Sequence, residues 1–187
     1  MSAPPPIPSD LLLLCIDMQP KFVAAISDGA NVQRRCGFAL AAAHGLALPV
    51  AFTEQVPQKL GGTAPALLAL APGAAVWAKE TFSALADAAI RDAVLRTRGA
   101  RHLLLCGIET PVCVYQTAVA ALAEGLQVTV LSDAVGARRP DDARACLDAL
   151  ARAGAHVLPA ETVFYAMLHD VKHPFFKTYT QLVKSHA

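Results

Sequence analysis

The chain of 187 residues has little charge, few aromatic side chains and no long apolar run. Charged residues make up 17% and aromatic residues 6%, whereas hydrophobic residues reach 55%. A chain this apolar can bury enough surface to fold, which excludes intrinsic disorder. Uninterrupted apolar runs reach only six residues, as in 11–16, whereas a membrane-spanning helix needs roughly 20. The composition therefore predicts a folded protein that does not span a membrane.

An excess of one charge sign is also absent, because 16 Lys and Arg residues face 15 Asp and Glu residues, for a net charge of +1. Without a basic stripe to neutralise phosphates, nucleic acid is not an expected partner. The five cysteines form an odd set with no Cys-x-x-Cys pair, which argues against a disulfide framework. No basic segment precedes an apolar one near residue 1. We expect a cytoplasmic protein whose proline-rich segment 1–9 is flexible.

Short apolar runs alternate with Ala- and Leu-rich stretches of helical periodicity. The predicted strands are 11–16, 48–53, 75–78, 103–106, 128–131 and 156–158. The other predicted segments are helices at 32–46, 83–98, 112–123 and 141–153, a loop without regular pattern at 57–65, and one or two closing helices within 161–184. This alternation predicts a single three-layer α/β/α domain over 1–187, with a mostly parallel sheet. If the strand order is 3-2-1-4-5-6, ligands bind between the carboxyl ends of the first and fourth strands.

Polar residues follow the predicted strands at that edge. Asp17 follows the first strand and the segment 106–113 follows the fourth, so a carboxylate and a thiol reach one crevice. Thr110, which precedes a proline, is a candidate N-cap, and Cys113 then lies in a first helical turn that favours the thiolate. Lys79 ends the third strand at the same edge. The alternatives are a buried structural cysteine, a turn-capping aspartate and a solvated lysine.

Other polar residues have weaker signals. Asp133 is expected to cap the turn after the fifth strand, and Arg138 and Arg139 are either solvated or face an acidic group of a substrate. His169 and His173 have the i,i+4 spacing that places two side chains on one helix face. Without a Glu in HExxH spacing, this pair is a weak candidate for metal binding.

A family resemblance rests on the order and spacing of residues 13–22, 79–83, 106–113 and 132–134. These segments resemble the isochorismatase-like cysteine hydrolase superfamily. Residues 53–61 and 173–177 look most like its isochorismatase-domain-containing branch. The resemblance implies a six-stranded parallel sheet in the order given above and a cis peptide bond between Ile108 and Glu109.

The same resemblance implies a catalytic triad of Asp17, Lys79 and Cys113, with the backbone N–H groups of Glu109 and Cys113 as the oxyanion hole. In that scheme Cys113 attacks a carbonyl carbon, and Asp17 takes the thiol proton and passes it to the leaving nitrogen. Lys79 holds Asp17 ionised and favours the thiolate. Water then hydrolyses the thioester.

The expected pocket side chains are Gln19, Phe22, Gln55, Phe82 and Tyr115. Nicotinamidases of this superfamily carry metal-binding histidines where this chain has residues 53–55, Thr-Glu-Gln, so we expect neither a metal nor another cofactor. True isochorismatases lack the cysteine. The sequence therefore predicts a homo-oligomeric cysteine hydrolase that acts on a small amide or a related carbon–nitrogen bond. The alternative is a catalytically silent interaction protein that keeps the fold.

Overall fold

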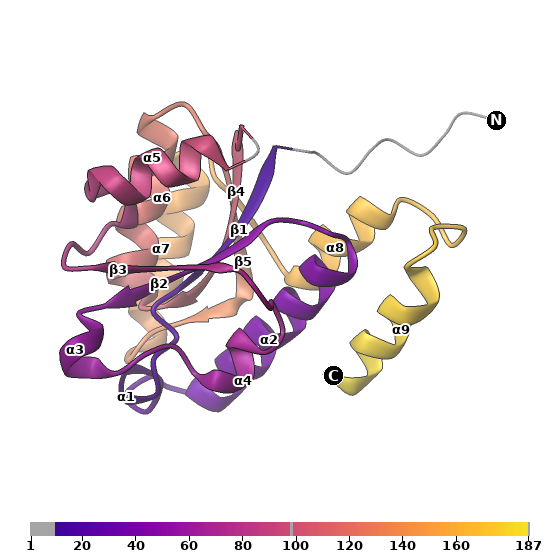
Figure 1. The fold of residues 1–187 in the computed structure, drawn as a ribbon, viewed down its shortest axis with the longest axis horizontal. Helices are drawn as coiled ribbons and strands as arrows, with labels where there is room; N and C mark the ends of the chain where they lie inside the picture. The colour runs from indigo at the N-terminus through magenta and orange to yellow at the C-terminus, as the bar shows by residue number, and fades with distance from the viewer. Residues whose placement is uncertain (1–9, 98, 187) are drawn as a thin grey trace.

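The computed structural model describes residues 10–97 and 99–186, so the segment 1–9 that we expect to be flexible lies outside it. All the strands in this part of the chain form one parallel sheet in the order β3-β2-β1-β4-β5-β6 (Figure 1). The strands are β1 (Leu11–Ile16), β2 (Val50–Gln55), β3 (Ala75–Lys79), β4 (His102–Ile108), β5 (Gln127–Gly136) and β6 (His156–Leu158). The predicted strand order is confirmed.

Helices cover both faces of the sheet. The helices are α1 (Pro20–Val23), α2 (Gly29–Gly45), α3 (Pro57–Leu60), α4 (Pro65–Leu68), η1 (Ala84–Ala86), α5 (Ala88–Arg96), η2 (Thr110–Val114), α6 (Tyr115–Ala123), α7 (Pro140–Arg152), α8 (Ala160–Leu168) and α9 (Phe176–Ser185). One layer holds α2, α4, α8 and α9, and the other holds α5, α6 and α7 (Figure 1). In the described residues no helix is both long enough and apolar enough to cross a membrane.

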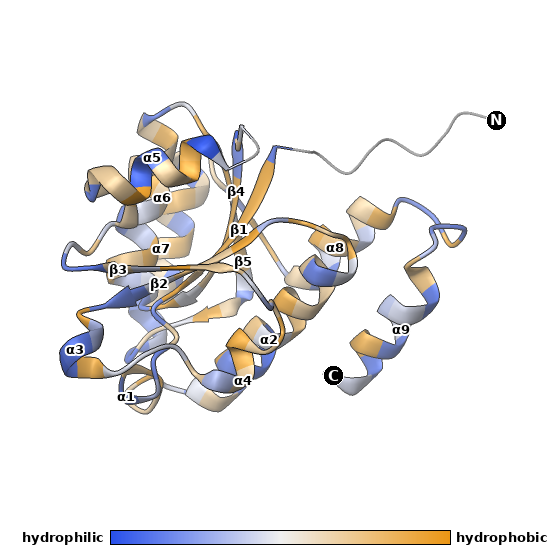
Figure 2. Cartoon of the chain, viewed as in Figure 1, coloured by the Kyte–Doolittle hydropathy of each residue, from blue (hydrophilic) through white to orange (hydrophobic). Residues whose placement is uncertain are grey.

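The central strands are apolar because helices cover them on both faces. In β1 the odd-numbered residues pack with α2, whereas the even-numbered residues pack with α5 and α6. Figure 2 shows β1 as hydrophobic along its length, whereas the helices alternate between hydrophobic and hydrophilic residues. This pattern is typical of a parallel sheet between two helical layers.

Two predicted segments need correction. The segment 57–65 is not an irregular loop, because α3 begins at Pro57 and α4 begins at Pro65, and the fixed φ of proline suits a first helical turn. The predicted helix 83–98 is divided into η1 and α5. Asp87 accepts hydrogen bonds from the backbone N–H groups of Ala89 and Ile90, so it caps α5 and separates the two helices.

The predicted N-cap role of Thr110 is wrong. Its hydroxyl donates to the carbonyl oxygen of Gly136 at 3.0 Å, which ties η2 to the end of β5. The chain before η2 is equally constrained, since Gly107 has φ 109° and a Cβ there would lie 2.1 Å from the carbonyl oxygen of Ile16. Glycine is therefore needed where β4 passes β1, immediately before the segment that carries Cys113.

Asp133 also differs from the prediction, because it lies inside β5 and links three elements. Its Oδ2 accepts hydrogen bonds from Nε and Nη2 of Arg35 at 2.9 and 2.5 Å. Its Oδ1 accepts one from the backbone N–H of Ala160 at 2.7 Å, at the start of α8. The carboxylate thus joins α2, β5 and α8.

Asp133→Ala is expected to lower the free energy of unfolding by about 3 kcal/mol, because it leaves the buried Arg35 guanidinium without its main partner. Urea unfolding followed by circular dichroism measures this change. The matched control is Asp92→Ala in α5, which removes only exposed ion pairs with Arg91 and Arg96 and should cost less than about 1 kcal/mol. Equal losses in the two variants would contradict the structural role of Asp133.

Candidate active site

Three charged or nucleophilic side chains from different elements meet at the carboxyl edge of the sheet. Asp17 follows β1, Lys79 ends β3, and Cys113 lies in η2, directly after β4. The Lys79 Nζ lies 2.7 Å from Asp17 Oδ2 and 3.6 Å from Cys113 Sγ. All three side chains are buried. The structure therefore brings together the three residues that the family resemblance implied as a triad.

The register of the strands places two more polar residues against this group. Thr53 lies opposite Ile16 in the β1–β2 pair, and its hydroxyl donates to Asp17 Oδ1 at 2.7 Å. Gln55 lies opposite Lys79 in the β2–β3 pair, and its Oε1 accepts a hydrogen bond from Lys79 Nζ at 2.5 Å. Each carboxylate oxygen of Asp17 therefore has a donor, and the Lys79 ammonium is fixed from two sides.

We predicted no role for Thr53. Its signal in the sequence is a polar residue near the end of an apolar strand, at the edge where ligands bind. That signal is weak, because only the strand register shows that Thr53 faces Asp17 rather than solvent. Buried polar groups need hydrogen-bond partners, and Thr53 supplies one for the carboxylate.

The backbone at the ends of β1 and β2 is unusual. Asp17 has φ 51° and Val56 has φ 42°, both in the left-handed region. Aspartate tolerates this region, but a β-branched valine is strained there by about 1–3 kcal/mol. Hydrogen bonds hold both residues in place, from Asp17 N–H to the Thr53 carbonyl at 3.0 Å and from Val56 N–H to the Lys79 carbonyl at 2.9 Å. The site thus includes a strained turn next to the lysine.

The ionisation of Cys113 differs from the expectation. Burial and the negative charge of Asp17 raise the pKa of the Cys113 thiol to about 12, although the Lys79 ammonium acts in the opposite direction. The helix start was expected to favour the thiolate, but desolvation and the Asp17 carboxylate outweigh the effect of the Lys79 ammonium. Cys113 is therefore a protonated thiol at rest, and it must lose its proton when it attacks.

A pocket of about 450 Å³ opens beside Cys113. Its lining is mainly apolar and consists of Phe22, Ala25, Ile26, Gln55, Phe82, Ile108, Glu109, Val112, Cys113 and Arg138. Three of the five predicted pocket residues, Phe22, Gln55 and Phe82, are in this set. Phe82 is 56% exposed, so it lies at the mouth rather than in the core.

The other two predicted pocket residues do not line this pocket. Gln19 is buried, where its Oε1 accepts from the Gln55 N–H at 2.7 Å and its Nε2 donates to the carbonyl oxygens of Gln55 and Gly61. It therefore braces the backbone of Gln55. Tyr115 is the first residue of α6 and packs with the core on the α5–α6 side of the sheet.

The remaining polar candidates are also placed. Arg138 lines the pocket, and its Nε lies 3.1 Å from Glu109 Oε2, whereas Arg139 pairs with Asp142 on the surface. His169 follows the last residue of α8 with φ 66°, so it does not share a helix face with His173 as their spacing suggested.

The peptide bond between Ile108 and Glu109 is cis. It joins the end of β4 to η2, so the backbone N–H groups of Glu109 and Cys113 belong to the short segment that carries the thiol.

A parallel sheet with this strand order, which presents a cysteine, a lysine and an aspartate at its carboxyl edge, is the arrangement that the family resemblance implied. The isochorismatase domain model matches residues 11–162, and the chain therefore belongs to the isochorismatase family.

Two curated relatives are isochorismatase domain-containing proteins. The chain is 36% identical over 176 residues to isochorismatase domain-containing protein 2 of Bos taurus. This alignment covers 94% of this chain and 83% of the relative. The chain is 34% identical over 184 residues to isochorismatase domain-containing protein 1 of Salmo salar. The alignment spans only 63% of that relative's length.

Two solved structures share the fold. MAR1 ribonuclease from Caenorhabditis elegans is 30% identical, with a TM-score of 0.88 over 95% of this chain and 91% of that chain. The YcaC gene product from Escherichia coli, described as an octameric hydrolase of unknown specificity, is 22% identical, with a TM-score of 0.82 over 95% and 94% of the two chains. The second likeness concerns the fold alone.

Proposed function

We propose that this protein is a cysteine hydrolase that cleaves a small amide or a related carbon–nitrogen bond through a thioester, without a metal or other cofactor. The observation that carries the proposal is the contact of Lys79 Nζ with both Asp17 and Cys113 beside an apolar pocket. A nucleophile, a proton acceptor and a cation that contacts both are the groups that acyl transfer to a thiol requires.

In the proposed reaction the Sγ of Cys113 attacks the carbonyl carbon, and its proton moves to Asp17. The backbone N–H groups of Glu109 and Cys113 stabilise the resulting oxyanion. Asp17 then gives the proton to the leaving nitrogen, the carbon–nitrogen bond breaks, and a thioester remains. Water attacks the thioester with Asp17 as base, and the acid leaves as the thiol is restored.

Lys79 has a specific electrostatic role in this scheme. Before proton transfer its charge is paired with the Asp17 carboxylate at 2.7 Å, and after transfer the thiolate at 3.6 Å becomes its partner. A buried ammonium therefore faces a negative charge on both sides of the step, which avoids an unpaired buried charge. Gln55 keeps the ammonium in place through its Oε1.

The pocket favours a small substrate with an apolar acyl group, because most of its lining is aliphatic or aromatic. One structural relative is named a ribonuclease, but the net charge of +1 and the apolar lining support a small molecule rather than nucleic acid here. We also propose that the protein is cytoplasmic and forms a homo-oligomer. The exposed apolar side chains of Val76, Leu158 and Val171 support the oligomer, as does the octameric state of the YcaC gene product.

A screen of small aliphatic and aromatic amides for ammonia release tests the function. We expect turnover of at least one amide, and acid quenching in the steady state should trap the acyl group on Cys113, located by peptide mass spectrometry. Cys146→Ala removes the most exposed cysteine of the described residues and is the matched control, so it should keep both signals. Absence of turnover and of acylation across the screen would favour the silent interaction protein.

A further inference from the structure

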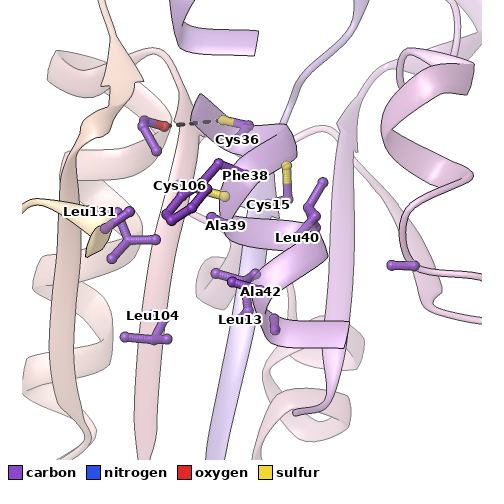
Figure 3. Packing of buried hydrophobic residues seen from close by; sticks show 14 of the residues in the cluster. Leu13, Cys15, Cys36, Phe38, Ala39, Leu40, Ala42, Leu104, Cys106 and Leu131 are labelled. Carbon is purple, nitrogen blue, oxygen red and sulfur yellow. Dashed lines mark hydrogen bonds between the residues drawn. The ribbon is translucent and has the colours of Figure 1, made fainter. Parts of the chain in front are cut away.

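Three other cysteines form a compact group in the core. Cys15 of β1, Cys36 of α2 and Cys106 of β4 have Sγ atoms that all lie within 4.8 Å of one another. Figure 3 shows their sulfur atoms between α2 and the two strands. Cys15 and Cys106 are register partners in neighbouring strands, and Cys36 covers them from the helix. Segments far apart in the sequence thus present three thiols to one point.

This group is separate from the proposed nucleophile. The three residues pack in the core between the sheet and α2, whereas Cys113 packs in the core on the opposite face of the sheet. None of the three is needed in the hydrolytic scheme. Their arrangement therefore calls for an account of its own.

The geometry of the group suits coordination of a single atom by three sulfurs. With bonds of about 2.3 Å from sulfur to a central atom, three sulfurs around that atom lie about 4 Å apart or less, which is within the 4.8 Å that separates these Sγ atoms at most. The ligands stand on two strands and a long helix, which are rigid supports. Soft thiophilic elements prefer such sulfur sets.

The electrostatics of the core restrict what this site accepts. The Sγ of Cys36 donates to the carbonyl oxygen of Ala134 at 3.2 Å, as a protonated thiol does. A complex with net charge would be costly here, because all three side chains are fully buried in apolar surroundings.

We infer that Cys15, Cys36 and Cys106 form a three-coordinate site for trivalent arsenic, taken up as neutral arsenous acid. Three As–S bonds form and three As–O bonds break, and each thiol proton leaves with a hydroxide as water. No electron is transferred, and both the incoming species and the final complex are neutral. A divalent ion with three thiolates would instead leave a negative charge in the core.

The pocket offers a route to the site. Ile26 and Ile108 line the pocket and also belong to the same core cluster as the three cysteines. Ile108 is two residues from Cys106 on β4, so both side chains lie on the same face of the strand. Only core side chains thus lie between a small neutral molecule in the pocket and Cys106. Neither the sheet nor a helix separates the two.

The test uses the full chain with Cys113→Ala and Cys146→Ala, which leaves the three core cysteines as its only thiols, in a phosphine reductant that contains no thiol. Arsenite at about a hundredfold excess over its Kd should raise the Tm by about 5 °C or more. Native mass spectrometry should show one arsenic that replaces three protons. X-ray absorption at the arsenic edge should show three sulfur neighbours and no oxygen.

The added Cys36→Ala substitution should remove most of the Tm increase, with folding checked by circular dichroism without arsenite. Cys106→Ala provides a second variant if the first one unfolds. An unchanged Tm in the parent, or an equal increase in the parent and a folded variant, would overturn the inference. So would a Cys36-dependent Tm increase with Zn²⁺ alone, because that would show that the core accepts a charged ion.

Discussion

Cys113→Ala is expected to abolish hydrolysis of any amide that the wild-type protein turns over, while substrate binding remains nearly unchanged. The thiol is the atom that forms the new bond, so its loss removes the reaction path rather than one of several contributions. It adds little to ground-state affinity, because the pocket is lined mainly by other apolar side chains. Steady-state rates measure the first effect, and calorimetric titration of substrate into the variant measures the second.

Cys113→Ser is the more demanding form of this experiment. Serine keeps a hydroxyl at nearly the same position, but a hydroxyl is much harder to deprotonate than a thiol and is the weaker nucleophile. We therefore expect the serine variant to lose activity almost as fully as the alanine variant. Cys146→Ala should retain the wild-type rate. Turnover in both Cys113 variants, free of contaminating hydrolase, would show that another group is the nucleophile.

Much of the fold could be predicted because the signals are local. The run 11–16 is apolar throughout, as a strand covered on both faces must be, and the alternation of strands with helical stretches restricts the topology to a few arrangements. The strand order then places the ends of β1, β3 and β4 at one edge. Asp17, Lys79 and Cys113 follow from that placement together with the family resemblance.

The features that the sequence analysis predicted wrongly depend on contacts between segments that are distant in the sequence. Asp133 has the sequence context of a turn residue, yet Arg35 and Ala160 hold it inside β5. The Thr110 hydroxyl bonds to Gly136 on a neighbouring strand instead of its own helix. The protonated state of Cys113 depends on its burial and on the distance to Asp17, and neither can be read from the helix-start pattern.

Asp17→Asn and Lys79→Met should both lower hydrolysis, but they should move the pH dependence of Cys113 alkylation in opposite directions. Asp17 raises the pKa of Cys113 and Lys79 lowers it. Removing the carboxylate therefore lowers the pKa from about 12, and the thiolate forms at lower pH. Removing the ammonium raises the pKa further, so alkylation requires higher pH. Iodoacetamide rates against pH, measured in a Cys146→Ala background, report this directly.

Turnover and alkylation report different properties of the site. Turnover depends on proton transfer, whereas the alkylation rate reports how much of Cys113 is present as thiolate. Asp17→Asn should lose on the order of 10²-fold or more in turnover, because the amide cannot accept a proton, even though its thiol alkylates more readily. Lys79→Met should lose both turnover and thiol reactivity at neutral pH. Circular dichroism must show that each variant is folded, since each leaves a buried charge without its partner. The contradicting outcome is an Asp17→Asn variant that alkylates faster and still turns over at the wild-type rate. In that case ionisation of Cys113 would be sufficient for catalysis, and Asp17 would have no role in moving the proton.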